Sequence, residues 1–516
     1  MTVPAPEYLN IADYFLFDRL RQGMGEREAI RTDHASFSYR EVAARAAGFG
    51  DKLRHMGVKP EQRVLISLPD GVDFAAAILG TVSIGAVAVM INPELPTDHL
   101  AAILAASRAP VAATDPGYAS VFVEAAAREP TGIELVTPDS WPKALDGSSF
   151  EATRTHRDDV AIWLFSGGTT GAPKIVPQTH RSFANTTELY AKTTLGYRSD
   201  DVTIAVPRLY FGYATGSALF FPFSVGATTV LFGDKPTPEV MFDQIRRHRP
   251  TILITTPSAI GAMLNAPSVS DADLSSLRFA TSAGEALPDS LYHRWKERFG
   301  VELLDGLGTA EMWHIFVTNR IGDVKPGTVG KVVEGFVVKA CDEDGVEVAT
   351  GEVGRMWVRG GSRAWGYWQN LDLSAEAFRG EWFVGGDLVS IDDDGYVTHR
   401  GRADDAIKVK GKWLRPQDVE SCLLEHPEVR DCAVVAVDDA DGLLKPVAFV
   451  VTSGSVTEAE LQRYVLERLE PYKHPRRVFL VGELPKTHLG KVDRAALKAM
   501  ATQGSALDSG PWTLDS

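Results

Sequence analysis

The chain has 516 residues, of which 44% are apolar and 23% are charged, a balance that excludes a disordered, collagenous or coiled-coil protein. Acidic residues outnumber basic ones by 68 to 53, and the formal net charge of −15 disfavours nucleic acid as a main partner, because an acidic surface repels phosphates. At about 150 residues per domain, the length predicts two to four domains.

The cysteines and the uncharged stretches predict a cytoplasmic protein. Cys341, Cys422 and Cys432 form no C-x-x-C pair, so neither a disulfide framework nor a zinc knuckle is expected. The first 30 residues show no apolar core flanked by positive charge. Two uncharged stretches are long enough to be checked as membrane spans. The stretch 74–91 is interpreted as a buried helix followed by a strand, and the stretch 209–232 as a pocket wall, so neither is expected to cross a membrane.

Helical and strand patterns alternate along most of the chain, which predicts a layered α/β fold. In chain order the predicted elements before residue 401 are a helix at 38–56, a strand at 63–68, a helix at 74–79, and strands at 86–91, 160–165, 251–255, 277–282, 355–359 and 396–400. Helices are expected between the middle strands, and the strands become shorter after residue 354.

A domain boundary is predicted near 402–405, within the polar segment GRADDAIKVKG that begins at residue 401. Residues 1–403 would form a large N-terminal domain and residues 404–516 a small C-terminal α/β domain, which is long enough for its own core. The elements expected in the small domain are helices at 419–426 and 458–469 and strands at 429–437 and 447–452.

The strongest chemical signal is the segment FSGGTTGAPK at 165–174. Its glycines let the backbone approach a ligand closely, and backbone N–H groups with the hydroxyls of Ser166, Thr169 and Thr170 can surround a polyanion. Lys174 adds a positive charge. A plain surface loop rarely follows a buried strand directly, so the segment predicts a phosphate-binding loop. It is not a Walker A loop, which ends in Gly-Lys-Ser/Thr.

This loop resembles the signature of the adenylate-forming superfamily, which includes acyl- and aryl-CoA synthetases, luciferases and adenylation domains of peptide synthetases. Further segments resemble the motifs of this family in the family's order: TSAGEALP at 281–288, DGLGTAEMWHIF at 305–316, EWFVGGD at 381–387, GRADD at 401–405 and PKTHLGK at 485–491. The resemblance covers nearly the whole chain. It implies the adenylate-forming enzyme fold, with ATP, Mg²⁺ and coenzyme A as cofactors.

The resemblance also implies a role for individual residues. Phosphate binding is implied for Ser166, Gly167, Gly168, Thr169, Thr170, Gly171 and Lys174. Binding of adenine and ribose is implied for Gly284, Glu285, Ala286, Asp305, Gly306, Leu307, Gly308, Thr309, Asp387 and Arg402. The remaining implied roles are metal binding by Glu311, catalysis by Lys491, a hinge at Asp404 and a coenzyme A tunnel at Lys410 and Gly411.

The implied reaction has two halves. A substrate carboxylate first attacks the α-phosphorus of ATP, and Mg²⁺ on Glu311 together with Lys491 would neutralise the charge that develops. A thiol then attacks the acyl-adenylate and releases AMP. In the family the small domain rotates between the halves, here about Asp404.

The segment 208–232 resembles benzoate- and anthranilate-type aryl-CoA ligases, and so does the stretch 312–320. Phe211 and Tyr213 could stack on a flat ring, and His314 could hydrogen-bond the carboxylate or a ring substituent. Without the resemblance, such aromatic residues would be read as core. The expected acid pocket consists of Tyr210, Phe211, Gly212, Tyr213, Ala283, Gly308 and His314.

Three positions depart from the wider family pattern. Leu307 replaces an aromatic residue, Ala310 lacks the usual hydroxyl, and Gly385 stands where threonine is usual. These changes bear on rate and ATP affinity more than on reaction class. Two alternatives stay open: an aryl-AMP ligase that loads a carrier-protein phosphopantetheine, and a non-catalytic nucleotide-binding sensor. The ring substituents, the acceptor thiol and the choice between monomer and homodimer also stay open.

Overall fold

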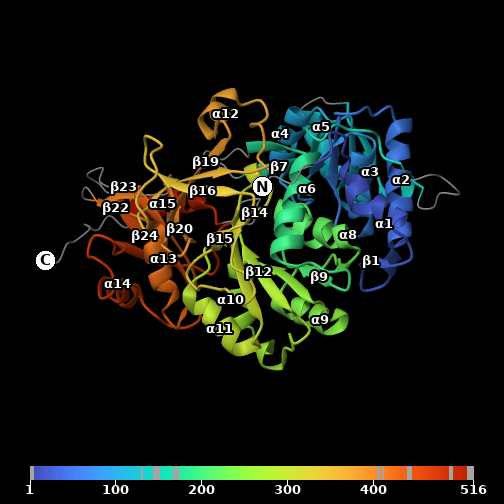
Figure 1. The fold of residues 1–516 in the computed structure, drawn as a ribbon. Helices are drawn as coiled ribbons and strands as arrows, with labels where there is room; N and C mark the ends of the chain where they lie inside the picture. The colour runs from blue at the N-terminus through green and yellow to red at the C-terminus, as the bar shows by residue number, and fades with distance from the viewer. Residues whose placement is uncertain are drawn as a thin grey trace.

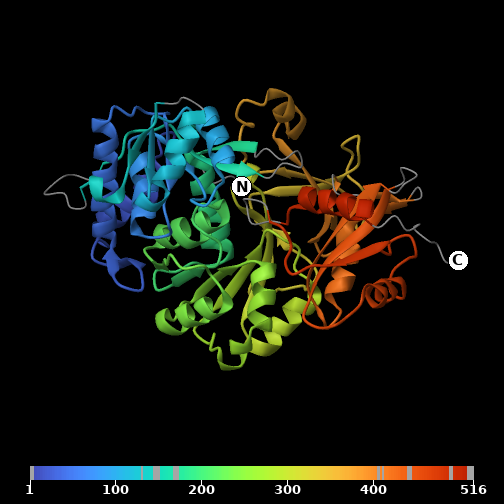
Figure 2. The ribbon, with the colours of Figure 1, turned by 180° about the vertical axis from the view of Figure 1, so that it is seen from behind.

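The structure is a computed structural model that describes residues 5–128, 132–142, 151–166, 174–403, 407–409, 412–438, 444–486 and 492–507. A large N-terminal domain of sheets and helices is followed by a small C-terminal domain (Figure 1). Seen from behind, the small domain, orange to red, lies beside helices α10 (Pro257–Asn265) and α11 (Asp289–Phe299) of the large domain (Figure 2).

The first sheet of the large domain carries the strand that leads into the glycine-rich loop. Its strands follow the order β6-β5-β3-β4-β7-β8, and the pairs are parallel except β7 with β8. The strands are β3 (Arg63–Ser67), β4 (Val87–Met90), β5 (Val111–Thr114), β6 (Glu134–Val136), β7 (Val160–Ser166) and β8 (Lys174–Thr179). Because side chains alternate along β3, Val64 packs with the helices of one face and Leu65 with those of the other.

Helices on both faces cover this sheet. They are α2 (Tyr39–His55), α3 (Val72–Ser83), α4 (Thr97–Ser107) and α5 (Ala119–Arg128). A capping box begins α2, because the Ser38 hydroxyl accepts from the Glu41 N–H and the Glu41 carboxylate accepts from the Ser38 N–H. The uncharged stretch 74–91 forms most of α3 and then β4, which confirms its interpretation. Among the helices in the described ranges, none has both the length and the apolarity to cross a bilayer.

The second sheet runs through the middle of the large domain in the order β16-β17-β19-β20-β15-β14-β13-β12-β11-β9-β10-β1-β2, with β18 on β19. In this spatial order, the neighbouring strands from β13 to β10 pair in parallel. The neighbouring strands from β16 to β13 pair antiparallel. The strands are β1 (Glu28–Arg31), β2 (Ser36–Ser38), β9 (Val202–Ala205), β10 (Thr228–Val230), β11 (Ile252–Thr255), β12 (Phe279–Ala283), β13 (Glu302–Gly308), β14 (Ile315–Thr318), β15 (Gly330–Val332), β16 (Val337–Cys341), β17 (Gly354–Arg359), β18 (Phe378–Arg379), β19 (Trp382–Ile391) and β20 (Tyr396–Arg402).

Helices α9, α10 and α11 cover one face of the parallel part of this sheet. The opposite face packs on the aromatic helices that follow residue 211. The helices of the large domain not yet named are α1 (Asp18–Arg21), α6 (His180–Thr186), α7 (Gly212–Ala214), α8 (Phe221–Val225), α9 (Pro238–His248) and α12 (Leu371–Ala377), with π-helical segments at Asp13–Phe17, Thr187–Thr194 and Thr215–Phe220. The uncharged stretch 209–232 therefore forms buried helices that lead into β10.

The small domain confirms its predicted α/β pattern. Strands β23 (Val429–Asp438) and β24 (Leu444–Thr452) are antiparallel, and β25 (Arg477–Leu480) pairs with β24 in parallel. Helices α13 (Pro416–Leu424) and α14 (Glu458–Leu466) pack on one face of this sheet, and α15 (Arg494–Leu507) packs on the other. A short hairpin, β21 (Ile407–Val409) with β22 (Lys412–Leu414), precedes them.

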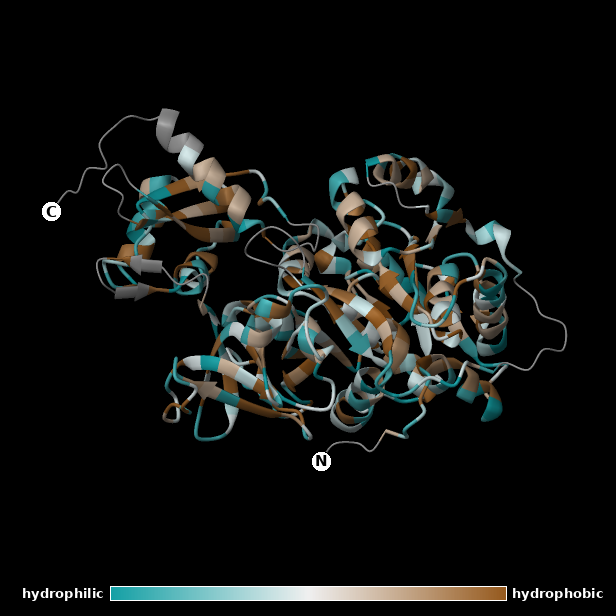
Figure 3. Cartoon of the chain, turned by 90° about the horizontal axis from the view of Figure 1, so that it is seen from above, coloured by the Kyte–Doolittle hydropathy of each residue, from teal (hydrophilic) through white to brown (hydrophobic). Residues whose placement is uncertain are grey.

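Hydropathy follows these layers. The strands inside each domain are mainly hydrophobic, and the outer surfaces of the helices carry the hydrophilic residues (Figure 3). The small domain has its own two clusters of buried apolar side chains, one on each face of its sheet. It therefore has a hydrophobic core of its own, as a separate domain requires.

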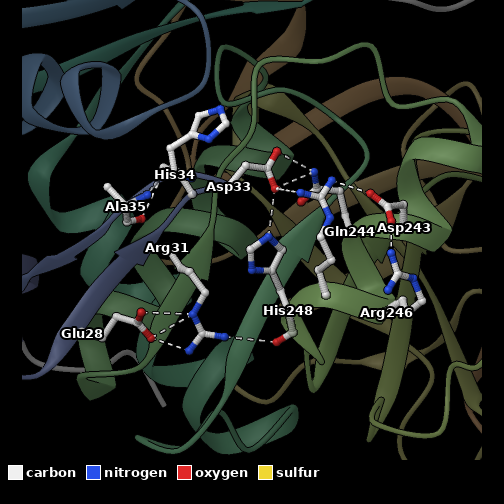
Figure 4. Close-up of polar contacts among 11 residues, drawn as sticks. Glu28, Arg31, Asp33, His34, Ala35, Asp243, Gln244, Arg246 and His248 are labelled. Carbon is white, nitrogen blue, oxygen red and sulfur yellow. Dashed lines mark hydrogen bonds and ion pairs between the residues drawn. The ribbon is translucent and has the colours of Figure 1, made fainter.

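The N-terminal hairpin β1–β2 is tied to α9 by a network of charged and polar side chains (Figure 4). The Asp33 carboxylate accepts hydrogen bonds from Gln244 Nε2 at 2.9 Å and from Arg247 Nη1 at 2.8 Å, and it lies 3.2 Å from His248 Nε2. Arg31 donates to the His248 carbonyl at 3.1 Å. Burial acts to raise the pKa of Asp33, but these hydrogen bonds and the positive charges outweigh it and lower the pKa.

Candidate active site

The glycine-rich loop connects two paired strands at the edge of the first sheet. Ser166 ends β7, Lys174 begins β8, and the two residues are partners in the antiparallel register. The structure therefore places the first and last predicted phosphate-binding residues opposite each other. The predicted residues that lie outside the described part of the chain are Gly167, Gly168, Thr169, Thr170, Gly171, Asp404, Lys410, Gly411 and Lys491.

The ends of β12 and β13 bring the predicted adenine and acid-pocket residues together. Ala283 and Gly306 are partners in the parallel register. A Cβ atom on Gly308 would lie 2.5 Å from the His314 carbonyl oxygen, so a larger residue does not fit there. Glu285 is exposed, and its carboxylate accepts from the Ser258 N–H at 3.0 Å and from the Ser258 hydroxyl at 2.6 Å. Its side chain is thus bound to the start of α10.

Glu311 lies in a short 3₁₀ turn, Ala310–Met312, directly after β13. Its side chain is only 4% exposed, and the Tyr367 hydroxyl donates to Glu311 Oε1 at 2.9 Å. The Thr309 hydroxyl caps the turn by accepting from the Met312 N–H, and Gln178 Nε2 donates to the Ala310 carbonyl at 2.6 Å. The turn that carries Glu311 is therefore held by its own cap and by contacts to two distant parts of the chain.

The donor set at Glu311 fits magnesium. Mg²⁺ prefers hard oxygen ligands and is usually held by one or two carboxylates together with the phosphates of a substrate. Within the described ranges, no cluster of three or more His, Cys, Asp or Glu side chains could form a metal site from protein ligands alone. A single buried carboxylate, linked through Tyr367 to the neighbourhood of Lys174, is compatible with a metal ion shared between protein and phosphates.

Asp387 and Arg402, the two predicted ribose contacts, are partners across strands β19 and β20. Asp387 Oδ1 lies 3.7 Å from Arg402 Nη1 and 3.1 Å from His399 Nε2. Gly385, which departs from the family pattern, accepts from Arg355 Nε through its carbonyl at 2.8 Å. A Cβ atom there would lie 3.2 Å from the Phe383 ring, which explains why a threonine would crowd this site.

The segment that carries the predicted acid-pocket residues is anchored by a buried carboxylate. Asp70 Oδ1 accepts from the Leu209 N–H at 3.0 Å, and Asp70 Oδ2 lies 3.7 Å from Arg208 Nη1. Arg208 in turn donates to the Phe232 carbonyl at 2.7 Å. Burial raises the pKa of Asp70 to about 6, against the charge of Arg208. The two ends of the segment 208–232 are thereby tied to each other and to the turn after β3.

Within this segment, Tyr213 contacts Thr281 and His314. The Tyr213 hydroxyl and Thr281 Oγ1 are 2.7 Å apart, and His314 Nε2 is 3.1 Å from the Tyr213 carbonyl oxygen. The backbone of Trp313 has a φ of 70°, a conformation that L-residues rarely adopt, and its ring packs edge-to-face on Phe183 at 4.5 Å. The structure therefore brings the predicted pocket residues Tyr213 and His314 into direct contact.

Burial makes His314 neutral at physiological pH. The side chain is 3% exposed and lies among aromatic rings, and burial lowers its pKa to about 3. A neutral imidazole has one N–H group, and Nε2 uses it on the Tyr213 carbonyl. Nδ1 is buried and has no partner among the described residues. In this arrangement His314 orients Tyr213 and keeps no N–H group for a substrate carboxylate.

Asp305 is the other buried titratable group at this position. It is 4% exposed, and burial raises its pKa to about 8, while Ser282 and the Gly306 N–H lower it by less. Its Oδ1 atom has no hydrogen-bond partner in the part of the chain that the structure describes. Below about pH 8 the carboxyl group is therefore neutral, which suits a site between apolar strands.

Several site residues were missed by sequence reasoning. Tyr367, Gln178 and His399 have no local signal beyond their chemical type, and they reach the site only through the fold. Asp70 had a signal, because it stands in a Pro-Asp-Gly turn directly after a predicted strand. The carboxyl ends of parallel strands meet at one edge of a sheet, so its position near the site could have been inferred.

Known proteins resemble this chain over nearly its whole length. Residues 17–368 match the family model described as AMP-binding enzyme, and residues 418–491 match the AMP-binding enzyme C-terminal domain. A benzoate–CoA ligase of Thauera aromatica is 40% identical over 96% of this chain and 97% of its own length. A 4-hydroxybenzoate–CoA/benzoate–CoA ligase of Rhodopseudomonas palustris is 36% identical over 99% of this chain and 97% of its own length.

Among solved structures, an anthranilate CoA ligase in complex with anthranoyl-AMP superposes with a TM-score of 0.91 at 35% identity. The match covers 97% of this chain and 99% of that chain. Identity at this level, over nearly full length and through both domains, establishes common ancestry. The chain therefore belongs to the AMP-binding enzyme family of adenylate-forming proteins.

Proposed function

We propose that this enzyme is an AMP-forming aryl-CoA ligase, which joins an aromatic carboxylic acid to coenzyme A and releases AMP and pyrophosphate. The observation that carries the proposal is the local geometry of three separate motifs. Ser166 and Lys174 stand opposite each other, Asp387 faces Arg402, and Glu311 is held in a buried turn. Relatives named as benzoate– and hydroxybenzoate–CoA ligases, aligned over nearly the whole chain, support the same conclusion.

In the first half-reaction the chain would bring two anions together. Lys174 and the loop that it closes would bind the β- and γ-phosphates of ATP, and Asp387 with Arg402 would bind the ribose. Magnesium, when bound through Glu311, would supply positive charge against the phosphates. Lys491 would neutralise charge as the carboxylate oxygen attacks the α-phosphorus, so that pyrophosphate leaves and an acyl-adenylate remains.

In the second half-reaction the thiol sulfur of coenzyme A would attack the carbonyl carbon of the acyl-adenylate, and AMP would leave. The small domain, proposed to begin at residue 404, would rotate between the halves about Asp404. This movement would withdraw Lys491 and bring Lys410 and Gly411 toward the site. Rotation of a small domain about a short segment is a common structural change.

The acid pocket is proposed to hold a benzoate-like ring between Ala283, Gly308 and the segment Tyr210–Tyr213. Tyr210 and Phe211 are aromatic neighbours with ring centroids 4.5 Å apart, and Tyr213 is fixed by Thr281 and His314. Rigid aromatic walls favour a flat ligand over a flexible acyl chain. We therefore propose benzoate and its hydroxy and amino derivatives as the substrate class.

The experiment that tests the function is AMP release from a panel of acids: benzoate, 2-aminobenzoate, hydroxybenzoates, cinnamates and short fatty acids. Each acid is assayed with free coenzyme A and separately with a holo carrier protein. The proposal expects at least one benzoate derivative to be the best substrate and free coenzyme A to be the acceptor. Turnover with the carrier protein alone would instead establish an aryl-AMP ligase.

A separate assay, acid-dependent exchange of pyrophosphate into ATP, distinguishes an enzyme from a nucleotide-binding sensor. Exchange with an aromatic acid is expected, because the first half-reaction is reversible. A chain that binds ATP but shows no exchange with any acid of the panel would contradict the proposed function.

A further inference from the structure

Tyr367 lies between the two charged side chains that the described site offers to phosphates and metal. Its hydroxyl donates to Glu311 Oε1 at 2.9 Å, and Lys174 Nζ is 5.5 Å from the centroid of its ring. The side chain is 5% exposed. We propose that Tyr367 is a positioning residue that aims the Glu311 carboxylate at the magnesium ion of bound ATP, a role that rests on the proposed function.

The backbone around Tyr367 is fixed to both sides of the site. The Ala364 N–H donates to the Glu311 carbonyl at 2.8 Å, and the Trp368 N–H donates to the Ile175 carbonyl, in β8, at 2.9 Å. The Tyr367 N–H itself donates to the Ser374 hydroxyl at 2.9 Å. The segment therefore bridges the turn that carries Glu311 and the strand that begins with Lys174, and Tyr367 cannot move independently of either.

The Tyr367 hydroxyl has one O–H group, and it donates that group to Glu311. A phenol hydroxyl is a hydrogen-bond donor throughout the physiological pH range. A fixed donor on Oε1 sets the plane of the carboxylate and leaves Oε2 for another ligand. Groups that orient a metal-binding side chain in this way typically change metal affinity by about 10–100-fold when they are removed.

The ring and the hydroxyl serve different contacts, so their roles can be separated. The ring packs edge-to-face on Phe378, with centroids 5.3 Å apart, and lies under Lys174. Tyr367→Phe keeps both ring contacts and removes only the donor to Glu311. A defect of this variant that appears only when Mg²⁺ is present therefore reports on the carboxylate and not on packing.

The test is calorimetric binding of ATP to the full chain, once with Mg²⁺ and once with EDTA. The ratio of the two dissociation constants measures how much Mg²⁺ strengthens ATP binding. For Tyr367→Phe we expect this ratio to fall about tenfold, while the dissociation constant in EDTA is unchanged. In a Glu311→Gln background, Tyr367→Phe should have no further effect on the ratio, because the carboxylate that it orients is absent.

The chain offers a matched control in a second Tyr–Glu–Lys cluster. The Tyr14 hydroxyl donates to Glu188 Oε1, Lys192 Nζ donates to the same atom at 2.7 Å, and Lys192 Nζ is 5.2 Å from the centroid of the Tyr14 ring. Tyr14→Phe removes an equivalent hydrogen bond away from the site. It should leave the Mg²⁺ ratio as in the wild type.

The outcomes separate this inference from the proposed function. A Tyr367→Phe chain with the full wild-type Mg²⁺ ratio overturns the inference and leaves the proposed function intact. The inference is likewise overturned, and the proposed function left intact, if Tyr367→Phe lowers the Mg²⁺ ratio by the same factor in the Glu311→Gln background as in the wild type. A wild-type chain that binds ATP equally with Mg²⁺ and with EDTA overturns the metal role of Glu311, and the inference fails with it.

Discussion

Two buried side chains beside the proposed acid pocket, His314 and Asp305, are both neutral at physiological pH. Burial disfavours the charged form of each group, so it lowers the pKa of His314 to about 3 and raises that of Asp305 to about 8. A neutral pocket wall suits an aromatic ring and leaves the substrate carboxylate as the local negative charge. That charge would then be directed toward Lys491 and the magnesium ion, not opposed by Asp305.

The state of Asp305 predicts how stability depends on pH. Because its pKa is raised from the usual range near 4 to about 8, its contribution to stability is complete below pH 4 and is lost as the pH rises through 8. Asp305→Asn removes this dependence, since an amide does not titrate. The urea-unfolding free energy of the variant, relative to wild type, should increase by about 5 kcal/mol between pH 4 and pH 8. An unchanged difference would mean that Asp305 is ionised in the folded chain.

Lys491 is the proposed catalytic residue, and its removal has a predictable effect on the first half-reaction. Lys491→Ala should reduce acid-dependent pyrophosphate exchange by about 10²–10³-fold and leave ATP binding nearly intact, because the lysine would act on charge that develops in the transition state. Lys498→Ala, in the exposed part of α15, is the control and should keep full exchange. If exchange persists undiminished in Lys491→Ala, the catalytic role belongs to another residue.

Helix α15 follows the motif that contains Lys491, and its first residue, Arg494, is bound to other elements of the small domain. Arg494 Nη1 donates to the Val434 carbonyl at 2.6 Å and lies 2.8 Å from Glu420 Oε1, while Nη2 is 3.1 Å from Glu420 Oε2. The Glu420 carboxylate also accepts from the Val434 N–H at 2.7 Å. A bridge between Lys486 and Val492 joins the two sides of residues 487–491. The Arg494 contacts form a clamp that attaches the start of α15 to α13 and β23.

Breaking this clamp should destabilise the small domain. Arg494→Ala leaves the mostly buried Glu420 without its cation, which typically costs about 3 kcal/mol. Hydrogen exchange of β23 and α15 should quicken, while exchange in the first sheet of the large domain should not change. Arg468→Ala is the comparison, because its pair with Glu467 is exposed and should contribute about 0–1 kcal/mol. Equal effects of the two substitutions would argue against the clamp.

At the scale of the whole molecule, the two domains meet over a polar and incompletely packed surface. A cavity of about 410 Å³ lies between α11 and the end of α13, with Arg294 and Ser290 on one side and Glu425, His426 and Arg430 on the other. Polar contacts of this kind permit relative domain movement, whereas a large apolar interface would resist it. The interface is thus compatible with the rotation that the proposed reaction requires.

Asp431 on β23 predicts that the domain arrangement depends on pH. Burial and the charge of Glu285, from the large domain, raise its pKa to about 6; Lys486 opposes this shift and Glu420 adds to it. The arrangement is therefore favoured below pH 4 and loses this contribution as the pH rises through 6. Between pH 5 and pH 8 we expect about a tenfold shift toward other domain arrangements, measured by small-angle X-ray scattering.

Asp431→Asn should abolish this pH dependence, because an amide carries no charge against Glu285. Asp438→Asn, at the exposed other end of β23, is the matched control and should behave as the wild type. Identical scattering curves for the wild type at pH 5 and pH 8 would contradict the role of Asp431.

The amino-acid sequence alone was enough to predict the class of fold, the family and the positions of the elements with the clearest hydrophobic patterns. The predicted helix at 38–56 is α2, the strand at 160–165 is β7, and the predicted small-domain elements appear as α13, β23, β24 and α14. These predictions hold because hydrophobic periodicity, capping residues and glycine-rich motifs act within a few residues of the chain. The motif residues were recognisable for the same reason, although a motif alone does not show what surrounds it.

Which side chains meet, and which of them are charged, became known from the folded chain. Tyr367 reaches Glu311 across 56 positions of sequence, and Asp70 reaches Leu209 across 139. His314 and Asp305 are neutral because other elements exclude water from them, and no local pattern encodes that exclusion. Contacts and protonation states depend on packing between distant segments, so they become visible only when the strands and helices are assembled.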